Sequence, residues 1–338
     1  MSLQELVAKM ASKPYTIKMG TKNLAKRFHA EEEMVKEARV AAKQKLAEKE
    51  DPEKKEDVSE HMFTRNNPTK STTGSRNGFP KILLYDLEKS PIEAYAWGIN
   101  KQRLNMSQIK TDWFLLAWSA KWLYSADVMG DRITGEEALR RDDSRITKSL
   151  WELIDQADII IGYNCKFADI PWMNTAFIKN GLNPPRSYQV IDPYDTAKKV
   201  FGFTCNKLDY VARYFGFETK MDTDMELWKA CCCGDEAALQ YMSDYNKKDS
   251  AILEEVYLRL RPWMKNHPNI TNFLEGSEYA CSYCGSDDLE EIPGKYYCTS
   301  VSRYKLYRCK DCGAIVRGRE NLNVKGMKKM VGIVSPAR

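Results

Sequence analysis

Two carboxylates follow an apolar run in the first third of the chain. The segment Lys81-Ile-Leu-Leu-Tyr-Asp86-Leu-Glu88 is typical of a strand buried on both faces, and it ends in acidic residues two positions apart. Residues i and i+2 of a strand point to the same face, so the two side chains converge. Like charges at a buried strand end persist with a cation or a proton between them. The spacing therefore predicts a cation site, and an acidic strand-end turn is the alternative.

A third carboxylate lies at the centre of an apolar helix face. Apolar and aromatic side chains recur at helical spacing between about Asp235 and Leu260, and Asp249 falls in the middle of that stripe. A lone carboxylate there is strongly destabilising unless it is paired or metal-bound. Tyr245 lies one turn earlier on the same face. These positions favour metal binding by Asp249, and an internal ion pair to an arginine is the alternative.

A fourth carboxylate, Asp169, follows the apolar run 158–162 and a polar loop that contains Asn164. The next helix is expected to begin near Ile170 or Pro171. Taken alone, Asp169 is interpreted as the N-cap of that helix.

Together these residues resemble the three signatures of DnaQ-like, or DEDD, 3′-5′ exonucleases, which have a ribonuclease H-like fold. The matching residues are Asp86-Leu-Glu88 for the first signature, Asn164 with Asp169 for the second, and Tyr245 with Asp249 for the third. The resemblance covers roughly residues 79 to 263. Segments such as Ala94-Tyr-Ala-Trp-Gly and Asn206-Lys-Leu-Asp-Tyr also look like a phage-encoded branch of ribonuclease H-like proteins.

The subclass follows from the third signature, which carries either His or Tyr. The chain's three histidines are His29, His61 and His267. None lies in the signature segments, so the resemblance implies the tyrosine subclass. One departure is that family members usually place Phe directly before the second-signature Asp, whereas Ala168 lies between Phe167 and Asp169 here.

The resemblance also implies a two-metal mechanism with two Mg²⁺ or Mn²⁺ ions. Asp86 would bridge both ions, Glu88 and Asp249 would hold the ion on the nucleophile side, and Asp169 would act on the leaving-group side. Tyr245 would orient the attacking water, because a phenol with a pKa near ~10 is a poor base at neutral pH.

Two Cys-x-x-Cys knuckles near the C-terminus predict a zinc ribbon. Cys281-Ser-Tyr-Cys284 and Cys309-Lys-Asp-Cys312 are each followed by glycine and are separated by 24 residues. Four thiolates suit one tetrahedral Zn²⁺, and Gly285 and Gly313 let the backbone turn around the sulfurs. So small a module buries little apolar area, so we expect a structural site whose zinc supplies much of the folding energy. Disulfides are the alternative.

Several residues are candidates for nucleic-acid contact. Tyrosines interleaved with Lys and Arg in the ribbon could stack on bases and neutralise phosphates, and Asn164 with the backbone near Leu87 would position a terminal nucleotide. The candidates in the ribbon are Arg303, Tyr304, Tyr307 and Arg308. A solubilising charged surface or a protein-docking module is the alternative for the ribbon.

The helices and strands predicted to hold the candidate site residues alternate in a way that predicts a mixed α/β protein. We expect a ribonuclease H-like sheet flanked by helices, with strands near 81–85, 94–98, 113–118, 158–161 and 188–191. The predicted order is a helical unit at 1–49, a flexible linker at 50–78, the exonuclease domain at 79–268, a zinc ribbon at 269–320 and a basic tail at 321–338. Within the first unit, Thr21–Phe28 and the helix from Glu31 have the proportions of a helix-turn-helix, and a solvated helical hairpin is the alternative.

Composition sets the class of partner. The net charge is only +5, but ten Lys and Arg against two acidic residues lie between Lys295 and Lys329. No apolar run approaches the ~20 residues of a membrane helix. We therefore expect a cytoplasmic protein, in the host cytoplasm if phage-encoded. The resemblance implies that it acts on the 3′ end of single-stranded DNA. RNA or branched duplexes are alternative substrates, and a separate DNA polymerase or replication protein is an expected partner. A nucleic-acid-binding adaptor without catalysis is the alternative from another class.

Overall fold

The structure is a computed structural model that describes residues 2–12, 21–49, 78–98, 103–217, 221–275, 279–323 and 335–336. Its centre is a five-stranded sheet with strand order β5-β4-β1-β6-β7. The strands are β1 (Ile82–Lys89), β4 (Leu115–Trp122), β5 (Met129–Arg132), β6 (Ile159–Ile161) and β7 (Gln189–Ile191). β4 pairs antiparallel with both β1 and β5, whereas β6 pairs parallel with both β1 and β7. The predicted mixed sheet is confirmed.

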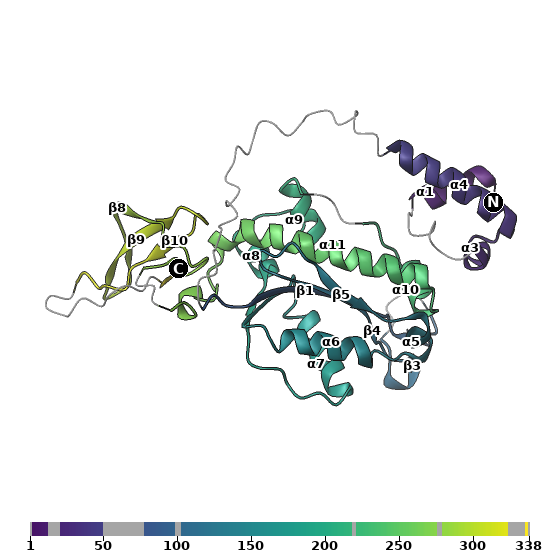
Figure 1. Ribbon diagram of the computed structural model, residues 1–338, viewed down its shortest axis with the longest axis horizontal. Helices are drawn as coiled ribbons and strands as arrows, with labels where there is room; N and C mark the ends of the chain where they lie inside the picture. Colours follow the sequence, from purple (N-terminus) through teal and green to yellow (C-terminus); the bar gives the residue numbers. More distant parts are fainter. Residues whose placement is uncertain are drawn as a thin grey trace.

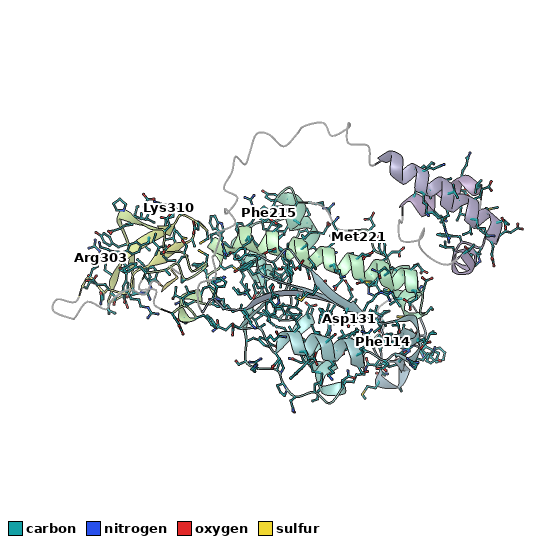
Figure 2. The ribbon with its side chains drawn as sticks, in the orientation of Figure 1. Phe114, Asp131, Phe215, Met221, Arg303 and Lys310 are labelled. Carbon is teal, nitrogen blue, oxygen red and sulfur yellow. The ribbon has the colours of Figure 1, made fainter. Side chains whose placement is uncertain are left out.

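Helices cover both faces of this sheet, with α6 and α7 on one side and α11 on the other (Figure 1). The helices of this region are α5 (Gly135–Arg140), α6 (Ser144–Ile154), α7 (Asp169–Lys179), α8 (Pro193–Val200), α9 (Leu208–Tyr214), α10 (Met225–Cys232) and α11 (Glu236–Leu260). Successive side chains of β1 point to opposite faces of the sheet, so this strand packs against the helices on both sides. Leu83 and Tyr85 share a core with α6 and α7, whereas Ile82 and Leu84 share one with α11. Side chains fill the space between the sheet and its helices (Figure 2).

One predicted strand is wrong in extent and place. Residues 94–98 do not join the central sheet; β2 (Glu93–Ala94) pairs with β3 (Ile109–Thr111) in a separate two-stranded sheet, and η2 (Met106–Gln108) precedes β3. Trp97 is 98% exposed, so this apolar side chain is not part of the core. The central sheet takes β5 in its place, a strand that the sequence analysis did not predict.

The N-terminal helices are α1 (Leu3–Ser12), α3 (Thr21–Phe28) and α4 (Glu32–Lys49). Leu6, Met10, Leu24 and Val35 are fully buried. α3 and α4 flank a turn at His29, which has a φ of +47°. DNA binding by this unit stays a prediction, and the predicted linker lies outside the described residues except for Gly78.

The C-terminal region is a small β unit that follows η3 (Arg261–Trp263) and η4 (Ile270–Asn272). Its strands are β8 (Leu289–Cys298), β9 (Arg303–Cys309), β10 (Ile315–Arg317) and β11 (Ser335–Pro336), in the order β11-β10-β9-β8. β8 and β9 pair antiparallel. Most of the predicted basic tail lies outside the described residues, but β11 pairs with β10. Among the helices that the structure describes, none is long and apolar enough to cross a membrane.

Candidate active site and cysteine cluster

Asp86 and Glu88 lie at the end of β1 that extends beyond its parallel neighbour. β6 pairs with β1 only as far as Leu84, whereas β4 accompanies it to Lys89. The two carboxylates continue the row of Ile82 and Leu84, which faces α11. Both side chains are half-buried. The strand therefore presents two carboxylates toward the helix that carries the third signature.

Asp249 meets this pair from α11. It is 3% exposed, and ligand oxygens of Asp86, Glu88 and Asp249 all lie within 4.8 Å of one another. Oxygens on opposite sides of one Mg²⁺ are about 4.2 Å apart, given ligand distances of about 2.1 Å. The three residues therefore fit a hard divalent cation. Asp249 thus faces two further carboxylates, and metal binding by this residue stays a prediction.

Asp169 lies beside these carboxylates but is not part of their group. It is the first residue of α7, and Ala168 rather than Asp169 occupies the N-cap position. Its carboxylate accepts hydrogen bonds from its own amide and from the amide of Leu87, the residue between Asp86 and Glu88. Burial, with a smaller contribution from the charge of Asp192, raises the pKa of Asp169 to about 7 despite these two hydrogen bonds.

Tyr245 packs against the same carboxylates. The side chain is 4% exposed, and its hydroxyl donates a hydrogen bond to Asp249. Burial raises the pKa of the phenol well above its usual value, and the charges of Asp249, Glu88 and Asp86 raise it further. Tyr245 therefore stays protonated at neutral pH and acts as a hydrogen-bond donor.

Asn246 is a site residue that sequence reasoning missed. The side chain is fully buried, and its Nδ2 donates to Oδ2 of Asp86 at 2.7 Å. Oγ of Ser119 on β4 donates to the Asn246 carbonyl oxygen at 2.7 Å. The sequence signal was only a polar residue next to Tyr245 in the third signature.

Asp192 organises the loop that leads to Asp169, and sequence reasoning missed it as well. Its carboxylate caps α8 by accepting from the amide of Tyr194 at 3.1 Å. It also accepts from the amides of Asn164 and Lys166 at 2.8 and 3.3 Å. Asn164 has a φ of +61°, a left-handed conformation that Asn tolerates. The backbone of Asn164 therefore fixes the loop before α7.

A cleft of about 500 Å³ opens beside Glu88. Its lining includes Leu87, Lys89, Trp172 on α7 and Trp228 on α10. The Lys89 ammonium lies 4.9 Å from the Trp172 ring centroid, a cation–π contact. The lining also includes the acidic Asp224, so Lys89 is its one basic residue within the described part of the chain. The two indole rings can accommodate a flat ligand next to the clustered carboxylates.

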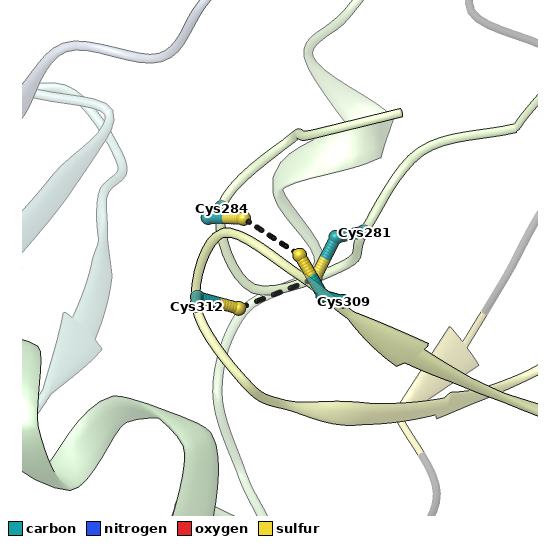
Figure 3. Close-up of side chains that lie close together, drawn as sticks. All are labelled: Cys281, Cys284, Cys309 and Cys312. Atoms are coloured by element: carbon teal, nitrogen blue, oxygen red, sulfur yellow. Dashed lines mark hydrogen bonds between the residues drawn. The ribbon is translucent and has the colours of Figure 1, made fainter. Parts of the chain in front are cut away.

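The four cysteines converge in the C-terminal unit (Figure 3). Sγ of Cys281 lies 3.6 Å from that of Cys312, and Sγ of Cys284 lies 3.6 Å from that of Cys309. Tetrahedral Zn²⁺ with Zn–S bonds of about 2.3 Å places its sulfurs about 3.8 Å apart. All four thiols are free rather than disulfide-bonded. The cluster is therefore compatible with a zinc ribbon.

The knuckle glycines have the geometry that the spacing predicted. Gly285 and Gly313 adopt φ values of +77° and +78°, which other residues rarely adopt. Their amides donate to the carbonyl oxygens of Cys281 and Cys309 at 2.8 and 2.9 Å.

The candidate nucleic-acid residues of the ribbon divide into two groups. Arg303, on the ribbon surface (Figure 2), has its guanidinium carbon 3.5 Å from the ring centroid of Tyr296. Tyr304 carries the guanidinium of Arg317 at 4.3 Å from its ring centroid, and Arg308 is exposed. Tyr307 packs edge-on against Tyr279 at the border of the core instead. Arg303 and Arg308 are thus exposed to a ligand, whereas Tyr304 and Tyr307 are half-buried and packed against other side chains of the chain.

A comparison with a family model agrees with this fold. The sequence model of the RNase_H superfamily matches residues 126–261, a segment that contains Asp169, Tyr245 and Asp249 and begins after β1. No match was found among curated proteins. The chain is also similar to the solved structure of the family B DNA polymerase from the hyperthermophilic archaeon Pyrobaculum calidifontis, with 16% sequence identity and a TM-score of 0.39. That similarity covers 54% of this chain and 25% of the polymerase. The central domain has a ribonuclease H-like fold.

Proposed function

We propose that the protein is a 3′-5′ exonuclease that hydrolyses single-stranded DNA with divalent cations. The observation that carries this proposal is the convergence of Asp86, Glu88 and Asp249 with the buried Tyr245 on a ribonuclease H-like domain. Carboxylates clustered this closely need a cation to offset their repulsion. An adaptor that has lost catalysis would have no reason to keep all four side chains.

The cations would be two Mg²⁺ or Mn²⁺ ions held by Asp86, Glu88 and Asp249, with Asp169 as a further ligand from α7. Such ions lower the pKa of bound water and neutralise charge on a phosphodiester. Asp169 is hydrogen-bonded to the Leu87 amide, so its carboxylate would reach the site from the first turn of α7. Asn246 holds one oxygen of Asp86 by a hydrogen bond and so fixes the orientation of that carboxylate.

The chain's own groups also define how a substrate end would bind. Tyr245 is protonated and hydrogen-bonded to Asp249, so it would orient a water molecule rather than remove its proton. The cleft of Trp172 and Trp228 beside Glu88 would hold the terminal nucleotide, with its base against an indole ring. Lys89 at the rim would face the phosphate. The backbone of Leu87 and Asn164 would line the approach.

The ribbon would extend the contact along the strand. Arg303, Tyr304 and Arg308 would neutralise phosphates or stack on bases, with the four cysteines holding one structural Zn²⁺. We also propose that a separate polymerase or replication protein supplies the substrate ends.

End-labelled oligonucleotides test the activity directly. With Mg²⁺ or Mn²⁺, single-stranded DNA labelled at its 5′ end should give a ladder of products, and 3′-labelled DNA should release labelled mononucleotide at once. EDTA and Asp86→Ala should abolish both. Faster cleavage of RNA or of branched duplexes than of single-stranded DNA would change the proposed substrate. Binding of nucleic acid without any cleavage would favour the non-catalytic adaptor.

A further inference from the structure

Arg261 is a fixed positive charge inside the protein. It follows α11 directly and is 3% exposed, and a guanidinium remains protonated in proteins. One terminal nitrogen donates to the Tyr124 hydroxyl at 2.7 Å, and the guanidinium lies 5.8 Å from the Tyr257 ring centroid. Its Nε is buried without a hydrogen-bond partner among the described residues. A buried charge of this kind requires a counter-charge nearby.

The cysteine cluster is a source of negative charge that acts on Arg261. Arg261 forms no ion pair with a carboxylate within the described ranges, and the groups that act on its charge include Cys284 and Cys312. These cysteines and the end of α11 belong to one buried core. Four thiolates around one Zn²⁺ carry a net charge of about −2, which a neighbouring guanidinium offsets.

A row of buried polar side chains along α11 also connects Arg261 to the carboxylate site. The backbone amide of Tyr124 donates to Oε1 of Glu254 at 2.7 Å, and Glu254 forms a buried ion pair with Lys121. One helical turn earlier, Ser250 shares a hydrogen bond with Ser119 at 2.7 Å.

Asn246, which holds Asp86, lies one turn earlier again on the same face of α11. Positions four apart lie on one helix face, so the row follows α11 from the ribbon to the carboxylates.

We propose that Arg261 is the buried counter-ion of a zinc centre formed by Cys281, Cys284, Cys309 and Cys312. Zinc binding thereby fixes the end of α11 to the ribbon, and the ribbon is a structural part of the nuclease domain rather than an independent module. The proposal rests on zinc occupancy of the cysteines, which belongs to the proposed function, and it does not depend on nuclease activity.

The test uses the full-length chain loaded with zinc. Arg261→Met removes the charge, Arg261→Lys keeps it, and Arg259→Met is the control two residues earlier on α11. Zinc per chain is measured first, followed by the rate of zinc release to a chelator and hydrogen exchange of peptides from residues 246–260. We expect Arg261→Met to release zinc roughly tenfold faster or more, in line with the effect of groups that support metal ligands.

The remaining expected results concern the comparison variants. Arg261→Lys should lie close to wild type, and Arg259→Met should match it. In Arg261→Met, and in wild type stripped of zinc, amides of residues 246–260 should exchange faster. If Arg261→Met does not fold, the stripped wild type and Arg261→Lys carry the test.

Four results would overturn the inference. A wild-type chain that binds no zinc removes its premise, whatever the nuclease assay shows. Zinc release from Arg261→Met at the wild-type rate, or equal defects in Arg261→Lys and Arg261→Met, would exclude a counter-ion role. Unchanged exchange in residues 246–260 after zinc removal would show that the ribbon is independent of α11.

Discussion

At the scale of single residues, the carboxylate site stores repulsion that a cation would relieve. Asp249 is almost fully buried, and the charges of Asp249, Glu88 and Asp86 all act on the Tyr245 phenol. Without a cation, these charges destabilise the folded protein, because desolvation and mutual repulsion disfavour ionised carboxylates.

Asp249→Asn should therefore separate activity from stability. Loss of one ligand charge should cost about 4 kcal/mol of transition-state stabilisation, or roughly a thousandfold in rate. In EDTA the variant should unfold at or above the wild-type temperature, because one repelling charge is gone. Cleavage of 5′-labelled DNA and thermal unfolding measure the two effects. Asp244→Asn, on the same helix, should keep full activity, and full activity of Asp249→Asn would refute the site.

Asn246→Ala should weaken cation binding without removing a ligand. The hydrogen bond to Asp86 would be lost, and such supporting groups change metal affinity by roughly 10- to 100-fold. We expect the Mg²⁺ concentration for half-maximal cleavage to rise by that factor, with a smaller change in rate at saturating Mg²⁺. Gln240→Ala, exposed on the same helix, is the control. An unchanged Mg²⁺ requirement would assign Asn246 to packing alone.

At the scale of elements, α11 connects the carboxylate site to the segment that leads to the cysteine cluster. Its middle turns supply Tyr245, Asn246 and Asp249, and its C-terminal end contacts the segment that leads to the cysteines. His267 lies in that segment, where Nε2 is 2.9 Å from the Tyr257 hydroxyl and Nδ1 is 2.7 Å from the Pro268 carbonyl oxygen. A neutral imidazole satisfies both contacts, donating from Nδ1 and accepting at Nε2.

His267 should make the folded protein less stable in mild acid. Burial lowers the pKa of its imidazole to about 3, against an ordinary value of 6.5. Between these pH values the unfolded chain binds a proton that the folded chain does not, so the free energy of unfolding rises with pH and falls on acidification. From pH 7.5 to 5 the loss should be about 2 kcal/mol.

Denaturant unfolding of wild type and His267→Gln at both pH values checks this effect. The variant should lose about 2 kcal/mol less than wild type over the same interval, because glutamine does not titrate. Zinc is kept in excess so that protonation of the cysteine ligands contributes equally to the pH dependence of unfolding in both proteins. Equal pH dependence in the two proteins would contradict a neutral, buried His267.

At the scale of the whole molecule, the ribbon places exposed basic and aromatic side chains on the same chain as the carboxylate site. Arg303 stacks on Tyr296, and Arg308 is exposed on the neighbouring part of β9. If both contact phosphates, Arg303→Ala with Arg308→Ala should weaken single-stranded DNA binding. The slope of log K against log salt should fall by about 1.4, at about 0.7 per phosphate contact.

Fluorescence anisotropy over a KCl series measures this slope, with EDTA present to prevent cleavage. Arg140→Ala with Arg186→Ala is the matched control, because both arginines are exposed and lie outside the ribbon. A slope that is unchanged in the ribbon variant would assign these arginines to solubility or to protein docking.

The sequence by itself determined the residue types and their local geometry. Strand alternation placed Asp86 and Glu88 on one face, and helical periodicity placed Tyr245 and Asp249 on one stripe. The Cys-x-x-Cys knuckles with their glycines similarly indicated a four-thiol cluster. These features depend on residues within a few positions of each other, so local periodicity and spacing are enough to predict them.

Only the tertiary structure decided which distant groups meet. Asn246 reaches Asp86 across 160 positions of sequence, and Arg261 lies beside the cysteines only because α11 ends at the ribbon. The same holds for β5, which joins the sheet through pairing with β4, while the apolar segment around Trp97 turns out to be exposed. Such contacts depend on how layers pack and which edges pair, and a single sequence carries no period or spacing that records them.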